Sequence, residues 1–278
     1  MRNVRMLYLL PVIILLMLFL VLPLLSMLAP TFVWTGNPLQ HYFDFIQSSY
    51  NLRIMWRTLW TALVVTLVCA VFGIPTAFFI SGLSKKWKGI LMAITLFPML
   101  TNSVIRAFAW ITILGKNGVI NRLLEFLGVI NQPLSLLYTD FAIIIGSVYL
   151  FLPTMIITLV GVMDGIDNEI LEAGQTLGLS PLGVFRKIIV PLSMPGTIVG
   201  SILVFTGTLT AYTTPQLLGG NKKMVLATFL RQQAMTLGNW QTASVIAALM
   251  VILTLLVMKG LNLAASRLDK RELKGGAI

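Results

Sequence analysis

The chain has 278 residues, of which 57% are hydrophobic and only 10% are charged. Soluble domains usually carry about 25% charged residues, so this composition excludes an ordinary soluble protein. The formal net charge of +11 would suggest nucleic-acid binding in a soluble chain. Here the bases lie between long apolar runs, where they serve to orient a membrane protein. Because the apolar runs are continuous rather than alternating, a transmembrane barrel is excluded as well. We therefore predict an all-α, polytopic transmembrane helical bundle.

About six apolar runs are long enough to cross a bilayer as helices. The first run is longer than the 7–15-residue hydrophobic region of a secretory signal, so we expect it to be retained as a span. The whole chain, 1–278, is expected to form one transmembrane domain. The predicted spans cover residues 7–29, 58–82, 89–113, 140–163, 196–218 and 241–263.

Six spans place both ends of the chain on one side of the membrane. With the termini inside, the inner segments hold more lysine and arginine than the outer segments. This asymmetry favours a bacterial cytoplasmic (inner) membrane protein with both termini in the cytoplasm. The same orientation places the polar segment 164–195 in the cytoplasm.

Segment 164–195 is too polar to span lipid, and its first half predicts a short amphipathic helix. The helix is expected to begin after Asp167, a favoured N-cap residue. Glu169 and Glu172 then lie near the positive end of the helix dipole, and Gly178 is expected to end the helix. One apolar face is expected to pack on the membrane domain, and it consists of Ile166, Ile170, Ala173 and Leu177.

The second half of the segment predicts another short helix. It is expected to begin at Ser180-Pro181, because serine is a good N-cap and proline suits the first helical position. Pro191 is expected to end it, and Arg186 and Lys187 fall in its last turn, where cations are favoured. Its apolar side is expected to consist of Leu182, Phe185 and Ile189. The predicted unit is two helices on the membrane surface joined by an exposed corner; the alternative is a plain amphipathic connector.

Within this unit, Glu172-Ala173, Gly178, Ile188 and Pro191 resemble the EAA signature of ATP-binding-cassette (ABC) importer permeases. Two positions depart from the signature: Gly174 replaces its second alanine, and Val190 replaces the leucine before the proline. The resemblance implies a type I ABC importer permease fold, in which this loop docks on a separate ATPase subunit. The ATPase-coupling residues that it implies are Glu172, Ala173, Gly174, Leu177, Gly178, Leu179, Ser180 and Pro181.

Three further stretches, 37–62, 103–128 and 210–230, are similar to spermidine/putrescine-type permeases. The resemblance implies that the chain forms half of a translocation pathway for a small solute, with a polyamine as the expected solute. Aminophosphonate, ferric iron, sulfate and molybdate permeases share similar stretches, so these solutes stay as alternatives. The implied partners are ABC ATPase subunits, a sister permease and an external solute-binding protein, besides the lipid bilayer.

The sequence gives no sign of catalytic chemistry. It contains no Gly-x-x-x-x-Gly-Lys-Ser/Thr loop, so we expect ATP to be bound by a partner and this chain to be a non-enzymatic subunit without a cofactor. One histidine, His41, and one cysteine, Cys69, are too few for a metal-ligand cluster. A secondary transporter, the other class considered, would show inverted repeats and mid-membrane ion-coupling charges, and we find neither.

Several residues are candidates for the pathway or for contacts between subunits. Arg106 falls within a predicted span, where a charge usually faces protein or a water-filled cavity; a snorkelling arginine is the alternative. Asp140 opens the fourth predicted span near the outer face, and it either attracts a cationic solute or rests among headgroups. Tyr149, Phe205 and Tyr212 offer faces for cation–π contacts, with core packing as the simpler interpretation.

Overall fold

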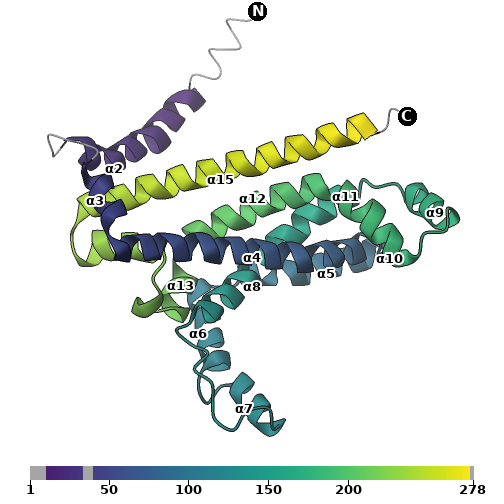
Figure 1. Ribbon diagram of the computed structural model, residues 1–278, viewed down its shortest axis with the longest axis horizontal. Helices are drawn as coiled ribbons and strands as arrows, with labels where there is room; N and C mark the ends of the chain where they lie inside the picture. The colour runs from purple at the N-terminus through teal and green to yellow at the C-terminus, as the bar shows by residue number, and fades with distance from the viewer. Residues whose placement is uncertain (1–10, 34–39, 276–278) are drawn as a thin grey trace, which may run out of the picture.

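The computed structural model describes residues 11–33 and 40–275, and all regular elements in these ranges are helical (Figure 1). This confirms the predicted all-α class. The first half comprises η1 (Met17–Val21), α2 (Leu22–Val33), α3 (Gln40–Gln47), α4 (Ser49–Ser81), α5 (Lys85–Leu100), α6 (Ser103–Leu114), α7 (Val119–Phe126) and α8 (Asp140–Met163). The second half comprises α9 (Asn168–Thr176), α10 (Pro181–Val184), η2 (Phe185–Ile189), α11 (Val190–Leu192), α12 (Met194–Thr210), α13 (Thr213–Leu218), η3 (Asn221–Lys223), α14 (Leu226–Arg231), η4 (Gln232–Thr236) and α15 (Trp240–Gly275).

Three of the described helices are long and apolar enough to cross a membrane: α4, α8 and the Trp240–Leu263 part of α15. Two bent helix pairs raise this number to five if each pair is one span. A shorter apolar helix covers Pro11–Met27. Residues 7–10 of the predicted first span lie outside the described residues.

The third predicted span, 89–113, is not a continuous helix. Helix α5 ends at Leu100 and α6 begins at Ser103, and the two directions differ by 92°. Thr101 is extended, and the Asn102 side chain caps the new helix by accepting a hydrogen bond from the Val104 N–H at 2.8 Å. A side-chain cap of this kind starts a helix afresh, and an average of hydropathy over the run does not reveal it.

The fifth predicted span, 196–218, is also divided. Helix α12 ends at Thr210, Ala211 adopts an extended conformation, and α13 begins at Thr213. At its other end α12 is preceded by a bend of 65° after α11. The extended residue interrupts the helical hydrogen bonding within an otherwise apolar run.

Helices α4, α8 and α12 pack closely because glycines let them approach. A Cβ atom at Gly73 of α4 would lie 2.6 Å from Cγ of Met155 in α8. A Cβ atom at Gly200 of α12 would lie 2.6 Å from Sδ of the same methionine. Small residues at such contacts are how membrane helices gain van der Waals packing without a hydrophobic driving force. Met155 is fully buried between the two glycines.

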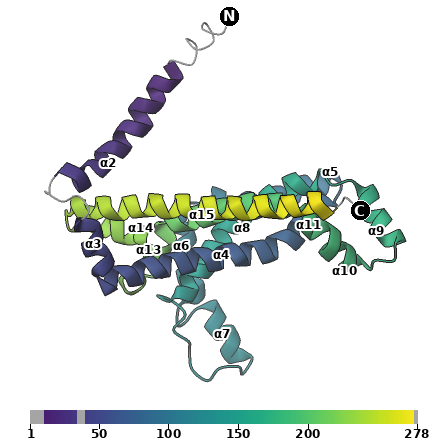
Figure 2. The ribbon, with the colours of Figure 1, turned by 45° about the horizontal axis from the view of Figure 1, so that its top comes forward.

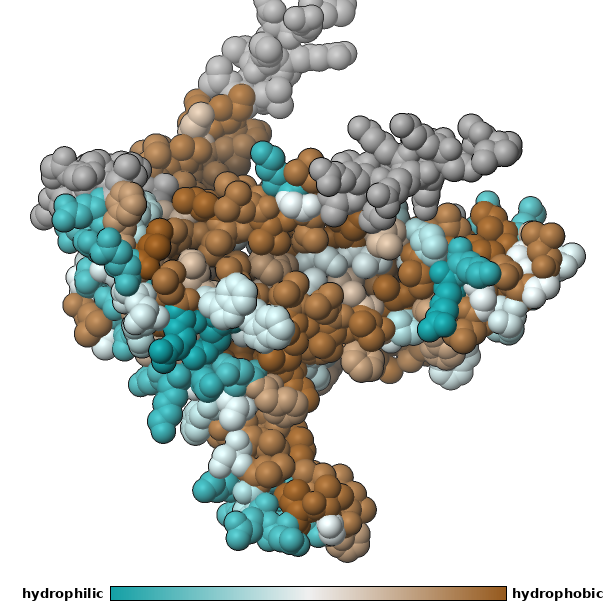
Figure 3. All heavy atoms as spheres, viewed as in Figure 1, coloured by the Kyte–Doolittle hydropathy of each residue, from teal (hydrophilic) through white to brown (hydrophobic). Residues whose placement is uncertain are grey.

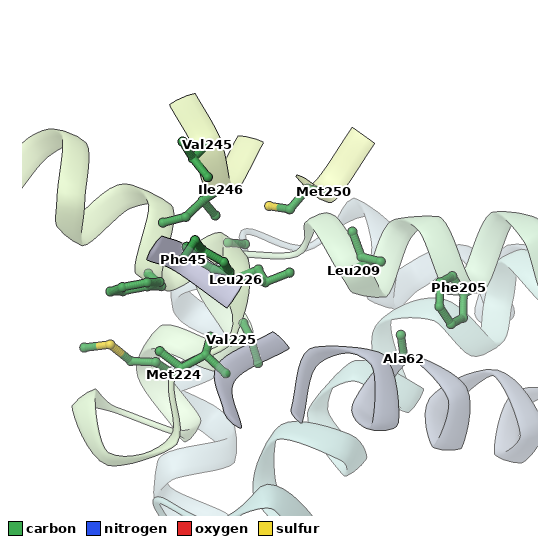
Figure 4. Close-up of a cluster of buried hydrophobic side chains, with 13 residues drawn as sticks. Phe45, Ala62, Phe205, Leu209, Met224, Val225, Leu226, Val245, Ile246 and Met250 are labelled. Carbon is green, nitrogen blue, oxygen red and sulfur yellow. The ribbon is translucent and has the colours of Figure 1, made fainter. Parts of the chain in front are cut away.

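A second cluster of buried side chains lies at the end of the bundle where α3 and α14 meet α4, α12 and α15 (Figure 4). Leu226 of α14 and Ile246 of α15 are fully buried there, with Phe45 of α3 and Leu209 of α12. Phe205 of α12 belongs to this cluster and is only 5% exposed. Core packing is therefore its observed environment, in place of an open face for a cation.

The long helices α4, α8, α12 and α15 lie side by side, and α9 to α11 lie at the end of the bundle opposite α3 (Figures 1 and 2). Helix α2 leaves the bundle, and α7 projects to one side. Apolar side chains cover the flank of the bundle, whereas hydrophilic side chains gather toward its two ends (Figure 3). This distribution suits a body surrounded by lipid along its middle.

Candidate coupling loop and pathway residues

The polar segment 164–195 begins with the helix boundaries expected from its caps. Helix α9 starts after Asp167, and Gly178 follows its last turn with φ +87°. Such a backbone conformation is open to glycine and strained for most other residues. Ser180 then caps α10, because its Oγ accepts a hydrogen bond from the Gly183 N–H at 3.2 Å, and Pro181 occupies the first helical position.

The buried face of α9 differs from the predicted one. Gly174 is buried, and Leu171 packs against the core of the bundle together with Ile166. The side chains of Leu177 and Ile170 are 85% and 43% exposed, and Ala173 is exposed as well. The predicted stripe is therefore correct only at Ile166.

The second helix of the loop explains this rotation. A Cβ atom at Gly174 would lie 2.5 Å from Cδ1 of Ile188 and 3.5 Å from Cγ2 of Val184. The backbone of α9 thus rests on the second helix at the glycine, which is the position that departs from the EAA signature. Because this close approach leaves no room for a side chain, Gly174 lies on the side of α9 that faces the second helix. Leu177 then faces away from the protein.

The second helix also differs from its prediction, because Pro191 does not end it. The helix passes through α10, the π-turn η2 and α11, and bends only at Ser193. In the π-turn the Val190 N–H donates to the Phe185 carbonyl, which changes the hydrogen-bond ladder just before the proline that lacks a donor. Ile189 is buried as predicted, but Leu182 is 61% exposed.

The corner between the two helices presents exposed apolar side chains. Leu177 is 85% exposed and Leu182 is 61% exposed, and the Glu172 side chain is exposed beside them on α9. Exposed apolar side chains on an otherwise polar projection are typical of a surface that another protein covers. The corner between the two helices is therefore exposed, as predicted.

The root of the coupling loop carries an ion pair that the sequence did not reveal. Nζ of Lys88, in the first turn of α5, lies 2.7 Å from Oδ1 of Asp164, the residue that caps α8. The side chains are 26% and 41% exposed. The two residues are 76 positions apart in the chain, so no local pattern identifies them as partners.

Arg106 lies at the break between α5 and α6. Its Nη1 donates to the Pro98 carbonyl at 2.6 Å and to the Thr101 carbonyl at 3.3 Å. The last carbonyls of a helix have no partner within the helix, and a cation is favoured at that end. Arg106 therefore fastens the end of α5 to α6 and is not a free charge.

Arg106 also lines a cavity of about 310 Å³ together with Tyr149 and Trp110. The rings of Tyr149 and Trp110 are in edge-to-face contact, with centroids 5.7 Å apart. The remaining lining side chains belong to Phe97, Thr101, Ile105, Ala109 and Ile113. The structure thus brings two of the candidate pathway residues, Arg106 and Tyr149, to one cavity.

Asp140 and Tyr212 are engaged by the protein's own cations. Oδ1 of Asp140 lies 3.2 Å from Nε of Arg57, and Oδ2 lies 2.7 Å from Nζ of Lys223. The guanidinium of Arg231 lies over the Tyr212 ring, 4.6 Å from its centroid. Each residue is thus already in contact with a cation of this chain, and the three cations were not among the predicted residues.

Comparison with known proteins decides the family. Residues 70–270 match the family described as the binding-protein-dependent transport system inner membrane component. The chain belongs to this permease family. Its members are transport components of the inner membrane, so the chain is a multi-pass permease subunit of an ABC importer, as the EAA resemblance implied.

Relatives of this permease include two named for polyamines. The chain is 32% identical over 247 residues to the spermidine/putrescine transport system permease protein PotB of Haemophilus influenzae, covering 86% of each chain. It is 33% identical over 237 residues to PotB of Escherichia coli, covering 84% of this chain and 81% of the relative. The molybdenum permease protein ModB of Azotobacter vinelandii is 28% identical over 63% of this chain and 75% of its own length.

A solved structure has the same fold as this permease. The crystal structure of a bacterial ABC transporter that imports the polysaccharide alginate aligns with a TM-score of 0.75 over 96% of both chains, at 19% identity. This agreement confirms the predicted importer permease fold. At this level of identity it carries no information about the solute.

Proposed function

We propose that this permease forms half of the pathway of an importer for a polyamine such as spermidine or putrescine. The observation that supports the solute most is the identity of 32–33% to permeases named for these compounds, over more than four fifths of both chains. The molybdenum permease is similar over a shorter part of the chain and at lower identity. Molybdate, sulfate, ferric iron and aminophosphonates are the alternative solutes.

Three kinds of protein partner complete the proposed transporter. A sister permease supplies the other half of the pathway, ABC ATPase subunits bind and hydrolyse ATP, and an external binding protein delivers the solute. A structure in which an alginate transporter is complexed with its periplasmic binding protein has the same permease fold, with a TM-score of 0.76. This neighbour supports the types of partner, and the exposed Leu177 and Leu182 support docking at the loop corner.

The proposed orientation follows from the position of the loop. Segment 164–195 and both termini face the cytoplasm, and Asp140 at the other end of α8 faces outward. ATP binding and release in the partner then favour different states of the ATPase pair. The loop corner at Glu172–Pro181 transmits this difference to the helices, which alternate between inward-open and outward-open states.

Solute selection is expected to reside mainly outside this chain. A polyamine carries several positive charges, yet Asp140 is paired with Arg57 and Lys223, and the Tyr212 face is covered by Arg231. Arg106 adds a further positive charge to the cavity beside Tyr149. These contacts support a path that binds a cation weakly, with recognition by the external binding protein.

The function is tested by uptake into proteoliposomes that contain the assembled transporter and its binding protein. We expect ATP-dependent uptake of radiolabelled spermidine or putrescine, and no uptake of labelled molybdate or sulfate. Uptake of an anion without polyamine uptake would show that the proposed solute is wrong, while the importer function would still hold. ATP hydrolysis by the purified permease alone would contradict the proposed division of labour.

A further inference from the structure

A cavity of about 570 Å³ lies at the end of the bundle that carries the coupling loop. Its walls come from five elements of this chain: the end of α4, the first turn of α5, the end of α8, and the helices α9 and η2. The volume falls within the range of about 300–1,000 Å³ that is typical of small-molecule sites. The corner residues 177–181 do not line this cavity, and no step of the proposed transport uses it.

The polar groups at this cavity favour a positively charged ligand. Helix α4 ends at Ser81 and α8 ends at Met163, and both residues line the cavity. The last carbonyl groups of a helix have no partner within it, and their partial negative charge favours cations. The carboxylate of Asp164 adds a full negative charge. Its Oδ1 pairs with Lys88, whereas Oδ2 has no hydrogen-bond or ion-pair partner in the part of the chain that the structure describes.

The remaining wall of the cavity is largely apolar. Phe78 and Leu171 pack against the core of the bundle, and Met163 and Ile189 are only 4% and 1% exposed. Carboxylate and carbonyl oxygens accept hydrogen bonds from ammonium groups, and apolar side chains pack on methylene chains. The combination therefore suits a molecule in which ammonium groups are joined by methylene chains, which is the chemical description of a polyamine.

The protein itself places such a group at the cavity. The side chain of Lys88 is a four-carbon stem that ends in an ammonium group, and its Nζ lies 2.7 Å from Oδ1 of Asp164. Putrescine has the same stem and ammonium group, with a second ammonium group at its other end. The Lys88 and Asp164 side chains are 26% and 41% exposed, and a partly exposed pair of this kind is weak. A free diamine can therefore compete with Lys88 for this carboxylate.

We propose that this cavity is a regulatory site that binds polyamine from the cytoplasm, with an ammonium group of the ligand on Asp164 in place of Lys88. The inference rests on the proposed function for the class of solute and for the side of the membrane that the cavity faces. Because its walls include the end of α8 and helix α9, a bound diamine links the coupling loop to the bundle. Import therefore slows as the solute accumulates inside.

The site is tested by calorimetry with putrescine on the assembled transporter, without its external binding protein. Asp164→Asn should weaken putrescine binding about fivefold or more, because it removes the charge that holds the ammonium group. Lys88→Ala should strengthen binding about two- to fivefold, the range for a partly exposed pair, because it removes the competitor. Asp167→Asn is the matched control, since Asp167 is an exposed acid nearby that does not line the cavity.

The opposite signs of the two effects separate binding from misfolding, which would weaken binding in both variants. Equal affinity for putrescine in the unmodified transporter, Asp164→Asn and Lys88→Ala would overturn the proposal, as would the absence of binding. Inorganic phosphate serves as the second probe. Binding of phosphate that is lost in Lys88→Ala, without binding of putrescine, would replace the proposed site by an anion site.

The regulatory effect is tested by filling the cavity. Gly82 lines it with φ −75°, and a Cβ atom there would meet only two carbonyl oxygens at 3.8 Å. Gly82→Leu therefore adds volume at the cavity without backbone strain. Gly89→Leu is the matched control, because a Cβ atom at Gly89 meets nothing within 4 Å and this residue does not line the cavity.

The measurement is the initial rate of labelled putrescine uptake into proteoliposomes preloaded with putrescine, divided by the rate into empty ones. We expect preloading to lower the rate at least about twofold in the unmodified transporter and in Gly89→Leu, and to have little effect in Gly82→Leu. A rate that preloading does not change in the unmodified transporter would overturn the regulatory role. The rate into empty proteoliposomes tests the proposed function separately, because its absence contradicts the solute, whereas calorimetry still decides the site.

Discussion

The two ends of α8 both carry an aspartate, but they are built for different purposes. At Asp140, Arg57 and Lys223 bind the two carboxylate oxygens, and Arg57 also donates to the Met224 carbonyl at 3.1 Å. At Asp164, a single lysine contacts one oxygen beside a cavity of about 570 Å³. The first arrangement ties three chain segments together, whereas the second leaves the adjoining loop room to move. One helix thus joins a fixed end at Asp140 to an adjustable end at Asp164.

The largest effect is expected at the corner of the adjustable end. Gly178→Pro is incompatible with the observed φ of +87°, because proline fixes φ near −65°. We expect at least about a tenfold loss of ATP-driven uptake in proteoliposomes, with the subunit still in the membrane. Gly178→Asn is the matched control, since asparagine adopts this conformation more readily. Normal uptake by the proline variant would show that the corner is not needed to couple ATP hydrolysis to transport.

A charge reversal at the same corner sharpens the assignment. Glu172 is exposed on α9 and has no structural partner in the described part of the chain apart from the hydrogen bond that its carbonyl accepts from Thr176. Glu172→Lys should therefore leave the thermal stability of the permease unchanged and lower uptake severalfold through the lost docking contact. Unaltered ATP-coupled uptake would show that this carboxylate does not contact the ATPase.

Removing the carboxylate at the fixed end should cost more stability than removing it at the adjustable end. The Asp140 side chain is 41% exposed, as is that of Asp164, but it pairs with two cations, of which Arg57 is only 17% exposed. We therefore expect Asp140→Ala to cost about 1–2 kcal/mol. Asp164→Ala removes one partly exposed contact and should cost below about 1 kcal/mol. Thermal unfolding in detergent measures both. Equal losses would erase the proposed difference between the two ends.

A smaller effect is expected from one hydroxyl at the fixed end. Oγ1 of Thr58 accepts a hydrogen bond from the buried Leu226 N–H at 2.8 Å, which joins α14 to α4. Thr58→Val leaves that donor unsatisfied and should cost about 1–2 kcal/mol of unfolding free energy. Thr76→Val is the matched control on the same helix, because its exposed hydroxyl bonds only to the Phe72 carbonyl within α4. Similar unfolding temperatures for both variants would show that the hydrogen bond between Leu226 and Thr58 does not stabilise the fold.

The smallest effect is expected at the glycine that departs from the EAA signature. Gly174→Ala favours helix by about 1 kcal/mol, but its new methyl group meets Cδ1 of Ile188. Because that atom is the flexible tip of a side chain, we expect the two terms nearly to cancel in a thermal unfolding measurement. Adding Ile188→Val removes the contact and should make the double variant more stable than the single one. If Gly174→Ala alone is already as stable as the double variant, the new methyl group does not press on Ile188.

Local signals in the sequence were sufficient for part of the molecule. The cap at Ser180-Pro181 and the glycine at 178 predicted the corner of the coupling loop, because both act through neighbouring backbone groups. Helix α9 also starts after Asp167 as expected, although the Asp167 side chain makes no capping hydrogen bond. Helix α8 occupies the predicted residues 140–163, where an uninterrupted apolar run has polar residues at both ends. The EAA spacing pointed to the family that the comparisons confirm.

Other features depend on contacts that no local pattern contains. The division of the predicted span 89–113 rests on the cap at Asn102 and on Arg106 reaching back to Pro98. The buried side of α9 depends on its contact with Ile188. Asp140 was identified as a candidate for attracting a solute, yet Lys223, which neutralises part of its charge, is 83 positions away. Sequence spacing selected the candidate residues, and contacts between distant parts of the chain determine their surroundings.

The packing of Met155 between Gly73 and Gly200 limits which substitutions can be accepted at these three positions. Gly73, Met155 and Gly200 share one fixed volume, and neither glycine has room for even a methyl group. A larger residue at either glycine therefore requires a smaller one at 155, so substitutions at the three positions are expected to arise together. Across homologues, these three positions should covary as a set that conserves total side-chain size.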